Sequence, residues 1–241
     1  MLCLTFIFLI CLVSAEVPSY IPVCGRRNPN LNECIKNSVE KLRPKLRAGI
    51  PEFDVPPIDP LIINERLVVA DTTDFKAGAT NVKLYDAGDF EIRSLNVDFK
   101  NQKVDINLFF KRMRSTGDYD VKAKIIVPIE ATGPVENDSN NIESNSTVMY
   151  KLVKTKKGQQ VFFTSAITKL KIGDYKTKFV GNSETTTALS DAINSVVNGN
   201  KGEIIAAITP HIERSMSRKQ LEIANQICKH FTFEELFPDR E

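Results

Sequence analysis

The sequence predicts an α+β protein in which a long, strongly curved antiparallel sheet is covered on its apolar face by helices. Apolar side chains recur every three or four positions over residues 31–46, the period of a helix buried along one side. Between about 61 and 181 the period changes to two, which is typical of strands with one wet and one apolar face. From about 187 the helical period returns. A curved sheet with one apolar face needs a cover, which these helices can supply.

The first helix is expected to begin near Asn30 and to end near Gly49. Asn30 can cap it, and Glu33, three residues later, completes the pattern of a capping box. Its apolar stripe consists of Leu31, Ile35, Val39, Leu42 and Leu46. The segment 51–60 holds four prolines, so we expect an extended connector rather than a helix there.

Alternation in the central region identifies the side chains that should face the interior. In the segment 104–110 apolar residues alternate with Asp105 and Asn107, and burying Asp105 unpaired would be costly. The same alternation occurs in 119–127 and begins again at Val161, where it continues through Ser165 to Ile167. The inward-facing residues of these strands that we expect to line the interior are Val104, Ile106, Leu108, Phe110, Tyr119, Val121, Ile125 and Phe163.

The connections between these strands are expected to be short. Turns are predicted at 101–102, 115–117 and 157–158, and a change of phase predicts a β-bulge near Ser94. The polar stretch 131–147 is interpreted as an exposed loop. It holds two acceptor sequons, at Asn137 and Asn145, so glycosylation is expected there.

Helical periodicity near the C-terminus predicts a short helix that ends at Gly199 and then a long one. Ile204, Ile208, Ile212 and Met216 follow each other at steps of four, and Pro210 is expected to kink or restart this helix. Ile208, Ile212 and Met216 complete the set of residues expected to line the interior.

The first 15 residues are interpreted as a signal peptide, because they are apolar, uncharged and end in Val13-Ser14-Ala15. This run is too short to span a membrane, which needs about 20 apolar residues. No stable membrane insertion is therefore expected. The remaining chain, 16–241, is predicted to form one secreted, extracellular domain.

Three cysteines follow the predicted signal peptide. Cys24 and Cys34 are expected to form a disulfide in an oxidising compartment, and a metal site is the less favoured alternative because neither histidine lies at ligand spacing. Cys228 lies in an apolar helical pattern, so a buried free thiol is expected, with pairing to another chain as the alternative.

Composition and motifs narrow the classes of function. A formal net charge of +2 argues against a nucleic-acid partner. The nucleophile, nucleotide and metal motifs of common enzymes do not occur, and His211 and His230 are isolated. We therefore predict a protein that is not an enzyme and has no cofactor and no metal.

Several motifs together resemble the insect takeout and haemolymph juvenile-hormone-binding protein family. They are the pair Cys24-x9-Cys34 at the start of a helix, PPIDPLII (56–63), GDYDVKAKIIVPIEATG (117–133) and IANQICKHFTFEELFP (223–238). Their order and spacing cover nearly the whole chain. The sequence departs from the family at Ala131, where the family often has a glycine, and in having no partner for Cys228 in a second disulfide.

The resemblance implies a TULIP-like fold, in which the curved sheet wraps a long helix and encloses an apolar tunnel. It also implies a secreted carrier of a hydrophobic small molecule: a juvenile hormone-like terpenoid, a fatty acid or another lipid. No protein partner is indicated, and a monomer is expected. Alternation alone is equally consistent with a filled core, so a secreted interaction module is the alternative function. A lipid esterase is the least favoured, because no nucleophile motif is present.

Overall fold

The computed structural model describes residues 17–71, 73, 75–124, 128–181 and 184–241. Helix α1 (Leu31–Ala48) and a 3-10 turn, η1 (Pro51–Phe53), precede the sheet. The strands are β1 (Leu61–Ile63), β2 (Leu67–Asp71), β3 (Phe75–Tyr85), β4 (Phe90–Asp98), β5 (Lys103–Lys124), β6 (Pro128–Thr155) and β7 (Gly158–Phe179). Helices α2 (Glu184–Gly199), α3 (Lys201–Cys228) and α4 (Phe233–Leu236) follow.

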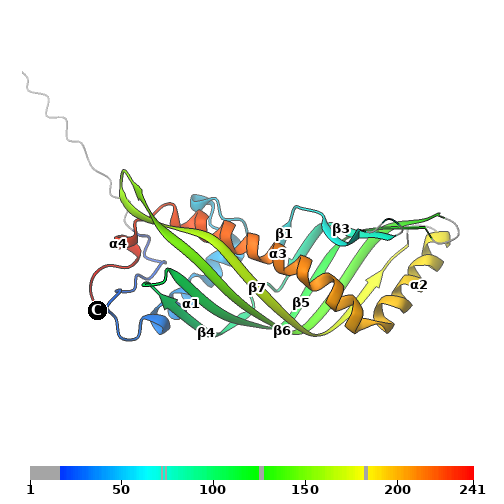
Figure 1. Cartoon of the computed structure of the whole chain (residues 1–241), viewed down its shortest axis with the longest axis horizontal. Helices are drawn as coiled ribbons and strands as arrows, with labels where there is room; N and C mark the ends of the chain where they lie inside the picture. The colour runs from blue at the N-terminus through cyan, green and yellow to red at the C-terminus, as the bar shows by residue number, and fades with distance from the viewer. Residues whose placement is uncertain (1–16, 72, 74, 125–127, 182–183) are drawn as a thin grey trace, which may run out of the picture.

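The strands form a curled antiparallel sheet in the order β1-β3-β5-β6-β7, in which β2 pairs with β3 and β4 pairs with β5. The long strands β5, β6 and β7 run through most of the elongated molecule, and α3 lies lengthwise against the sheet (Figure 1). Helix α1 lies at one end and α2 at the other. The predicted fold class, a strongly curved antiparallel sheet with a long C-terminal helix, is confirmed.

Two predicted breaks in the chain are wrong. Strand β5 continues through Ser115–Gly117, and the polar stretch 131–147 lies inside β6. Strand β6 pairs with β5 on one side and, from Val135, with β7 on the other, so most of its backbone is hydrogen-bonded despite its polar side chains. The polar side chains of β6 on the convex face remain in water and form cross-strand ion pairs, such as Glu143 with Arg93 at 2.8 Å.

Two changes of strand register explain one correct and one wrong prediction that were based on the alternation of apolar residues. The predicted bulge is confirmed between Ile92 and Ser94. A second shift, opposite Met149 and Tyr150, reverses the phase of β7 after Phe163. Ile167 is consequently 65% exposed and Thr168 only 2% exposed, so placing Ser165 and Ile167 in phase with Phe163 was wrong.

The helices follow their predicted spans with three differences. The capping box at Asn30 does not form, and the Asn30 N–H instead donates to Oδ1 of Asn28 at 2.8 Å. Helix α3 continues through Pro210 and does not restart there, so of the two expected outcomes a kink stays a prediction. Residues 51–53 form a 3-10 turn instead of extended chain, because a proline in the first turn has a suitable φ and needs no donor.

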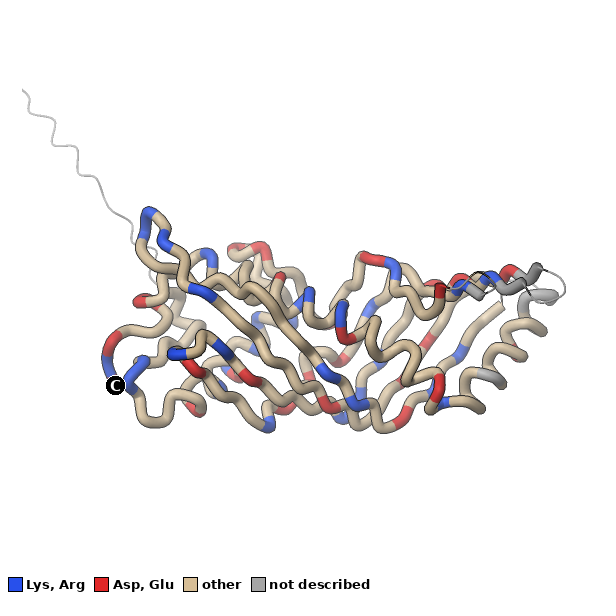
Figure 2. Tube along the Cα trace, viewed as in Figure 1, with Lys and Arg blue, Asp and Glu red and all other residues tan. Residues whose placement is uncertain are grey.

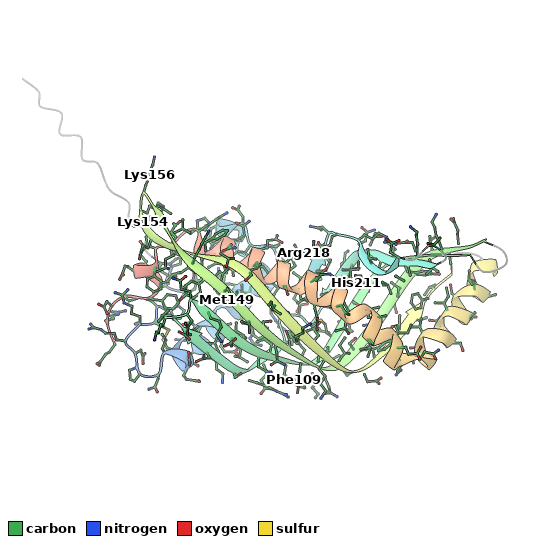
Figure 3. All side chains as sticks on the ribbon, in the orientation of Figure 1. Phe109, Met149, Lys154, Lys156, His211 and Arg218 are labelled. Carbon is green, nitrogen blue, oxygen red and sulfur yellow. A yellow bond between two sulfur atoms is a disulfide. The ribbon has the colours of Figure 1, made fainter. Side chains whose placement is uncertain are left out.

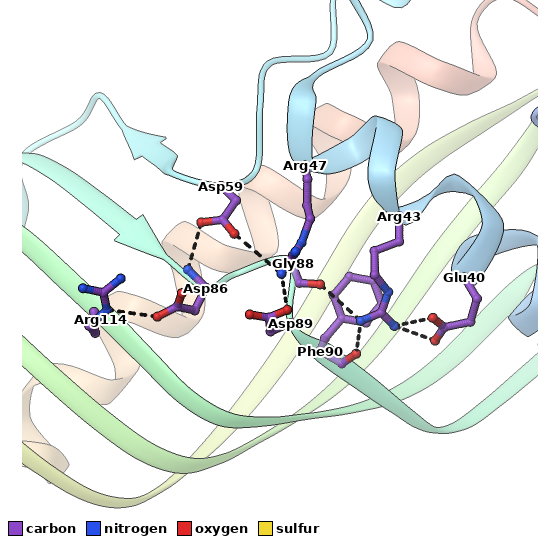
Figure 4. Close-up of polar contacts among 9 residues, drawn as sticks. All are labelled: Glu40, Arg43, Arg47, Asp59, Asp86, Gly88, Asp89, Phe90 and Arg114. Carbon is purple, nitrogen blue, oxygen red and sulfur yellow. Dashed lines mark hydrogen bonds and ion pairs between the residues drawn. The ribbon is translucent and has the colours of Figure 1, made fainter.

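Arginines on α1 attach this helix to the sheet. Arg43 donates to the carbonyls of Gly88 and Phe90 and pairs with Glu40, while Arg47 pairs with Asp89 (Figure 4). The Arg43 guanidinium also lies 4.0 Å from the centre of the Phe90 ring. These contacts fix α1 over the turn between β3 and β4.

Candidate functional site

Helix α3 lies across the concave side of the sheet and contacts both of its margins. It packs along β7, the last strand on one side, and also against β2 on the other side. Arg218 of α3 forms an ion pair of 3.0 Å with Glu65, just before β2. The helix therefore covers the opening of the curled sheet, and the apolar inner face beneath it is the candidate site.

Three asparagines bind the free edge of β7 through their side-chain amides. Asn194 accepts from the N–H of Phe179 at 2.8 Å and donates to its carbonyl at 2.9 Å. Asn198 makes the same pair of bonds with Thr177, at 3.1 and 2.8 Å, and Asn225 with Phe163, at 2.8 and 3.0 Å. Each amide thus takes the place of a neighbouring strand, which satisfies an edge that would otherwise offer unpaired groups. We refer to Asn194, Asn198 and Asn225 as the amide clamps.

Glu213 and Ser217 extend this contact along the middle of β7. The buried Glu213 carboxylate accepts from the N–H of Leu170 at 3.0 Å and from Nζ of Lys169 at 2.9 Å. Burial would raise the pKa of Glu213, but these two donors outweigh it and hold the pKa below its ordinary value. Ser217 Oγ accepts from the N–H of Thr168 at 3.2 Å. The joint between α3 and β7 is therefore polar and specific.

A solvent-open groove of about 600 Å³ follows the same joint. It is lined by residues 164–169 of β7 together with Glu213, Arg214, Ser217, Arg218 and Leu221 of α3. Arg218 is labelled beside it in Figure 3. This groove runs along the outside of the contact between helix and sheet.

The end of the molecule that holds α1 and α4 is filled with large side chains. One cluster, around Phe90, Phe110 and Ile142, lies between the sheet and its helices. A second contains Ile50, Phe53 and Phe231, and a third contains Tyr150, Val161 and Phe233. We refer to this region as the packed end.

Covalent and polar links also close the packed end. The disulfide between Cys24 and Cys34 joins the N-terminal segment to the start of α1. Arg26 forms an ion pair of 2.7 Å with Glu234, and the Arg27 N–H donates to the carbonyl of Arg240. The Cys228 thiol is free and lies against the third cluster, where burial raises its pKa to about 12.

The end that holds α2, which we call the α2 end, is lined differently. Its buried sheet residues include Ala77 and Ala131, and a Cβ at Gly133 would lie 2.2 Å from the Val180 carbonyl oxygen. Two buried larger residues here carry hydroxyls: Tyr119 bonds Ser190 of α2 at 3.0 Å, and Tyr175 donates to the Val197 carbonyl at 3.0 Å. The sheet therefore presents a floor of small residues, with two tyrosines fixed to α2.

The residues expected to line the interior are divided between the two ends. Val104, Leu108, Phe110 and Phe163 belong to the clusters of the packed end. Tyr119 lies at the α2 end, and Val121 pairs across the sheet with both Ala77 and Ala131. Ile106, Val121, Ile208, Ile212 and Met216 are half-buried. Ile125 lies outside the described residues. Whether they share one tunnel stays a prediction.

The two sequons occupy opposite faces of β6. Asn137 accepts from Thr177 Oγ1 at 2.9 Å and donates to Ser139 at 2.8 Å, with the inner side of β7 beside it. Asn145 is exposed and accepts from Asn107 Nδ2 at 2.6 Å on the convex face. Since the exposed loop does not exist, the geometry leaves Asn145 as the sequon open to a glycan.

Sequence reasoning missed the residues that attach the helices to the sheet edge. Asn194 and Asn198 are four positions apart, as are Glu213 and Ser217, which places each pair on one helix face. This polar stripe beside the apolar stripe was a readable signal. Its target, the edge of β7, could not be read from the helix alone.

Comparisons with known proteins agree with this architecture. A family model described as haemolymph juvenile hormone binding protein (JHBP) matches residues 2–238. Takeout 1 of Epiphyas postvittana superposes with a TM-score of 0.73 at 19% identity, covering 89% of this chain and 98% of that one. A lipopolysaccharide binding protein gives a TM-score of 0.33 at 13% identity, over 80% of this chain and 39% of the other, too distant to bear on the fold. A search of curated proteins finds no match.

Proposed function

Because the chain belongs to the haemolymph juvenile hormone binding protein family, we propose that it is an extracellular carrier that holds a hydrophobic small molecule beneath α3. The observation that supports this most directly is an apolar concave face roofed by a helix, with half-buried apolar residues on both surfaces. The disulfide is consistent with an oxidising, secreted environment.

The α2 end is the part of the inner face best suited to a ligand. The buried sheet residues here are small, whereas the packed end is occupied by aromatic clusters, which supports a ligand site at the α2 end. Ile208 and Ile212 of α3 and Val121 of β5 are only half-buried. Apolar side chains that are not fully covered by the protein are available to cover an apolar ligand.

Burial of hydrocarbon gives useful affinity without a charged anchor. A chain of about ten methylenes gains roughly 8 kcal/mol at about 0.8 kcal/mol each. This gross value corresponds to a Kd near the micromolar range before the cost of association is subtracted. The ligand class is therefore a terpenoid like juvenile hormone, a fatty acid or a lipid of similar length.

A filled-core interaction module is the competing function, and ligand content separates the two. Native mass spectrometry of gently purified protein should show an apolar molecule bound, and the stripped protein should take up a fluorescent fatty acid. A protein that is empty on purification and takes up no probe would contradict the carrier function. A protein that hydrolyses a lipid ester would also overturn it, in favour of an enzyme.

A further inference from the structure

The hairpin that joins β6 to β7 carries a concentrated positive charge. Its segment 151–162, KLVKTKKGQQVF, contains Lys151, Lys154, Lys156 and Lys157 and no acidic residue. Strand pairing continues to Thr155 and Gly158, and the Lys157 N–H donates to Thr155 Oγ1 at 3.2 Å, so the tip is an ordered turn. Figure 3 labels Lys154 and Lys156 where the hairpin projects from the packed end, and Figure 2 shows the same tip in blue.

The lysines of the tip differ from those elsewhere on the same strands. Lys171, Lys176 and Lys178 of β7 each lie directly opposite an acidic residue of β6: Glu143, Asp138 and Glu136. In contrast, Lys154 lies opposite Gln159 and Lys151 opposite Phe162. Within the described part of the chain, neither the four tip lysines nor the three of β7 form an ion pair, since Glu143 and Asp138 pair with Arg93 and Arg112. The tip lysines differ in having no acidic residue directly opposite them. Their charge is therefore available to an external anion.

Apolar side chains accompany this charge on the outward face. Phe162 is 46% exposed, with Lys151 Nζ 5.7 Å from the centre of its ring, and Met149 is 36% exposed on the neighbouring strand. Phe162 also borders a shallow groove of about 340 Å³ between the hairpin and the C-terminal part of α3. The nearby Glu222 is paired with Lys219 at 2.8 Å, which offsets its charge.

We propose that this hairpin docks the protein on an anionic phospholipid bilayer, with the lysines at the headgroups and Phe162 in the interfacial layer. Lysines close to an anionic membrane each contribute favourable binding, and an aromatic ring beside them suits the boundary between headgroup and acyl chain. One ring and four charges give a weak, reversible association, which salt reverses by screening. The proposal goes beyond carriage itself, since it names a membrane-docking surface at the end of the molecule opposite the proposed ligand site.

Vesicle co-sedimentation tests the electrostatic part. The protein should bind vesicles that contain equal amounts of phosphatidylcholine and phosphatidylglycerol. It should not bind vesicles made only of phosphatidylcholine. Replacing Lys154, Lys156 and Lys157 with Gln should weaken the partition coefficient roughly 100-fold at low salt, at about five-fold for each lysine. The matched control replaces Lys171, Lys176 and Lys178 with Gln, loses the same net charge and should bind nearly as the unmodified protein does.

A tryptophan reporter tests the apolar part. The chain contains no Trp, so Phe162→Trp supplies a single fluorophore at the tip, and Phe109→Trp supplies a control on the outer face of β5. Emission from Phe162→Trp should shift to shorter wavelength on the anionic vesicles, whereas emission from Phe109→Trp should not move. Equal shifts in both variants would overturn the proposed orientation.

Further results distinguish a failure of the membrane-docking proposal from a failure of the carrier function. Equal loss of vesicle binding in both lysine triples, or binding to a sulfated polysaccharide without binding to vesicles, would overturn the membrane proposal. Uptake of a fluorescent fatty acid from solution is measured on the same variants and should be unchanged. Failure of that uptake in the unmodified protein counts against the carrier function and leaves the vesicle result to stand by itself.

Discussion

The packed end and the α2 end are built on the same three long strands but are stabilised in different ways. The packed end combines three apolar clusters, a disulfide and ion pairs between the chain termini. The α2 end has small residues on the sheet, and its helix is attached by two amide clamps and two tyrosine hydroxyls. Strands of one sheet can therefore pack large apolar side chains at one end and carry small residues and polar helix contacts at the other.

The difference between the two ends also means that an inward-facing residue can have either of two roles, packing in a core or facing a ligand. Leu108 and Val121 lie on one strand, β5, and their neighbours place both on the concave side, although they are an odd number of positions apart. Leu108 packs against the cluster around Phe110, whereas Val121 lies between Ala77 and Ala131. Both residues face the same side of the sheet, but Leu108 is surrounded by larger side chains than Val121. We expect this difference to decide whether a substitution affects folding or ligand binding.

The largest effect is expected from truncating an aromatic ring at the packed end. Phe231 is 2% exposed and stacks edge-on against Phe53 at 5.3 Å between ring centres, so Phe231→Ala should cost about 3–5 kcal/mol of unfolding free energy. Phe179→Ala at the α2 end, where the ring is half-buried against Tyr119, should cost less than half of that. Denaturant unfolding of both variants measures the difference, and equal losses would contradict the comparison.

Enlarging a side chain should affect stability at one end and binding at the other. Leu108→Trp overpacks a filled cluster and should lower the unfolding free energy by about 1–3 kcal/mol. Val121→Trp enlarges the side chain beside Ala77 and Ala131, where the ligand is proposed to lie, so it should reduce uptake of a fluorescent fatty acid sharply while the Tm changes little. A Val121→Trp protein that binds the probe normally would argue against a ligand at the α2 end. Asn107→Trp on the convex face is the control and should change neither quantity.

The same physical terms explain which elements of the fold could be predicted from the sequence and which could not. Periodicity identified α1, α2, α3 and the bulge at Ser94, because each depends on local residue spacing. It failed at Ile167, since the register shift that moves this residue outward arises from the pairing of β7 with β6. It failed also at 131–147, where hydrogen bonds to two neighbouring strands outweigh a polar composition typical of loops.

The division of the candidate site could not be predicted for a related reason. Val104 and Val121 have the same residue type, and each lies in an alternating segment of β5, so nothing local distinguishes a core position from a ligand-facing one. What distinguishes them is the residues placed opposite by other strands: Val97 and Val148 in one case and two alanines in the other. That information lies in contacts between distant segments.

Removing an amide clamp should show which end opens first. Asn194→Ala leaves the N–H and carbonyl of Phe179 without their partner, a loss of about 1–2 kcal/mol. Because α2 is held mainly by hydrogen bonds and not by the large apolar clusters of the packed end, the opening should stay local, so amide exchange should accelerate around 177–179 and not around Phe231. Asn225→Ala at the packed end is the counterpart, and its cost should appear as a lower global unfolding free energy. Uniform acceleration of exchange in Asn194→Ala would show that the two ends unfold as one unit.

The smallest effect concerns the pH dependence of the joint between α3 and β7. The pKa of Glu213 lies below its ordinary value of 4.5 because the Leu170 N–H and the Lys169 ammonium favour the carboxylate. A lowered folded-state pKa means that this carboxylate stabilises the protein fully above pH 4.5, and that the contribution is lost as pH falls through the folded-state pKa. Glu213→Gln keeps an oxygen for the Leu170 N–H but removes the charge, so it should lower stability at pH 7 by about 1 kcal/mol and should approach the unmodified protein at acidic pH. Unfolding curves at both pH values measure this convergence, and Glu222→Gln, which changes an exposed carboxylate on the same helix, is the control. A Glu213→Gln deficit that is the same at both pH values would show that the charge contributes nothing and that shape alone holds α3 against the edge of β7.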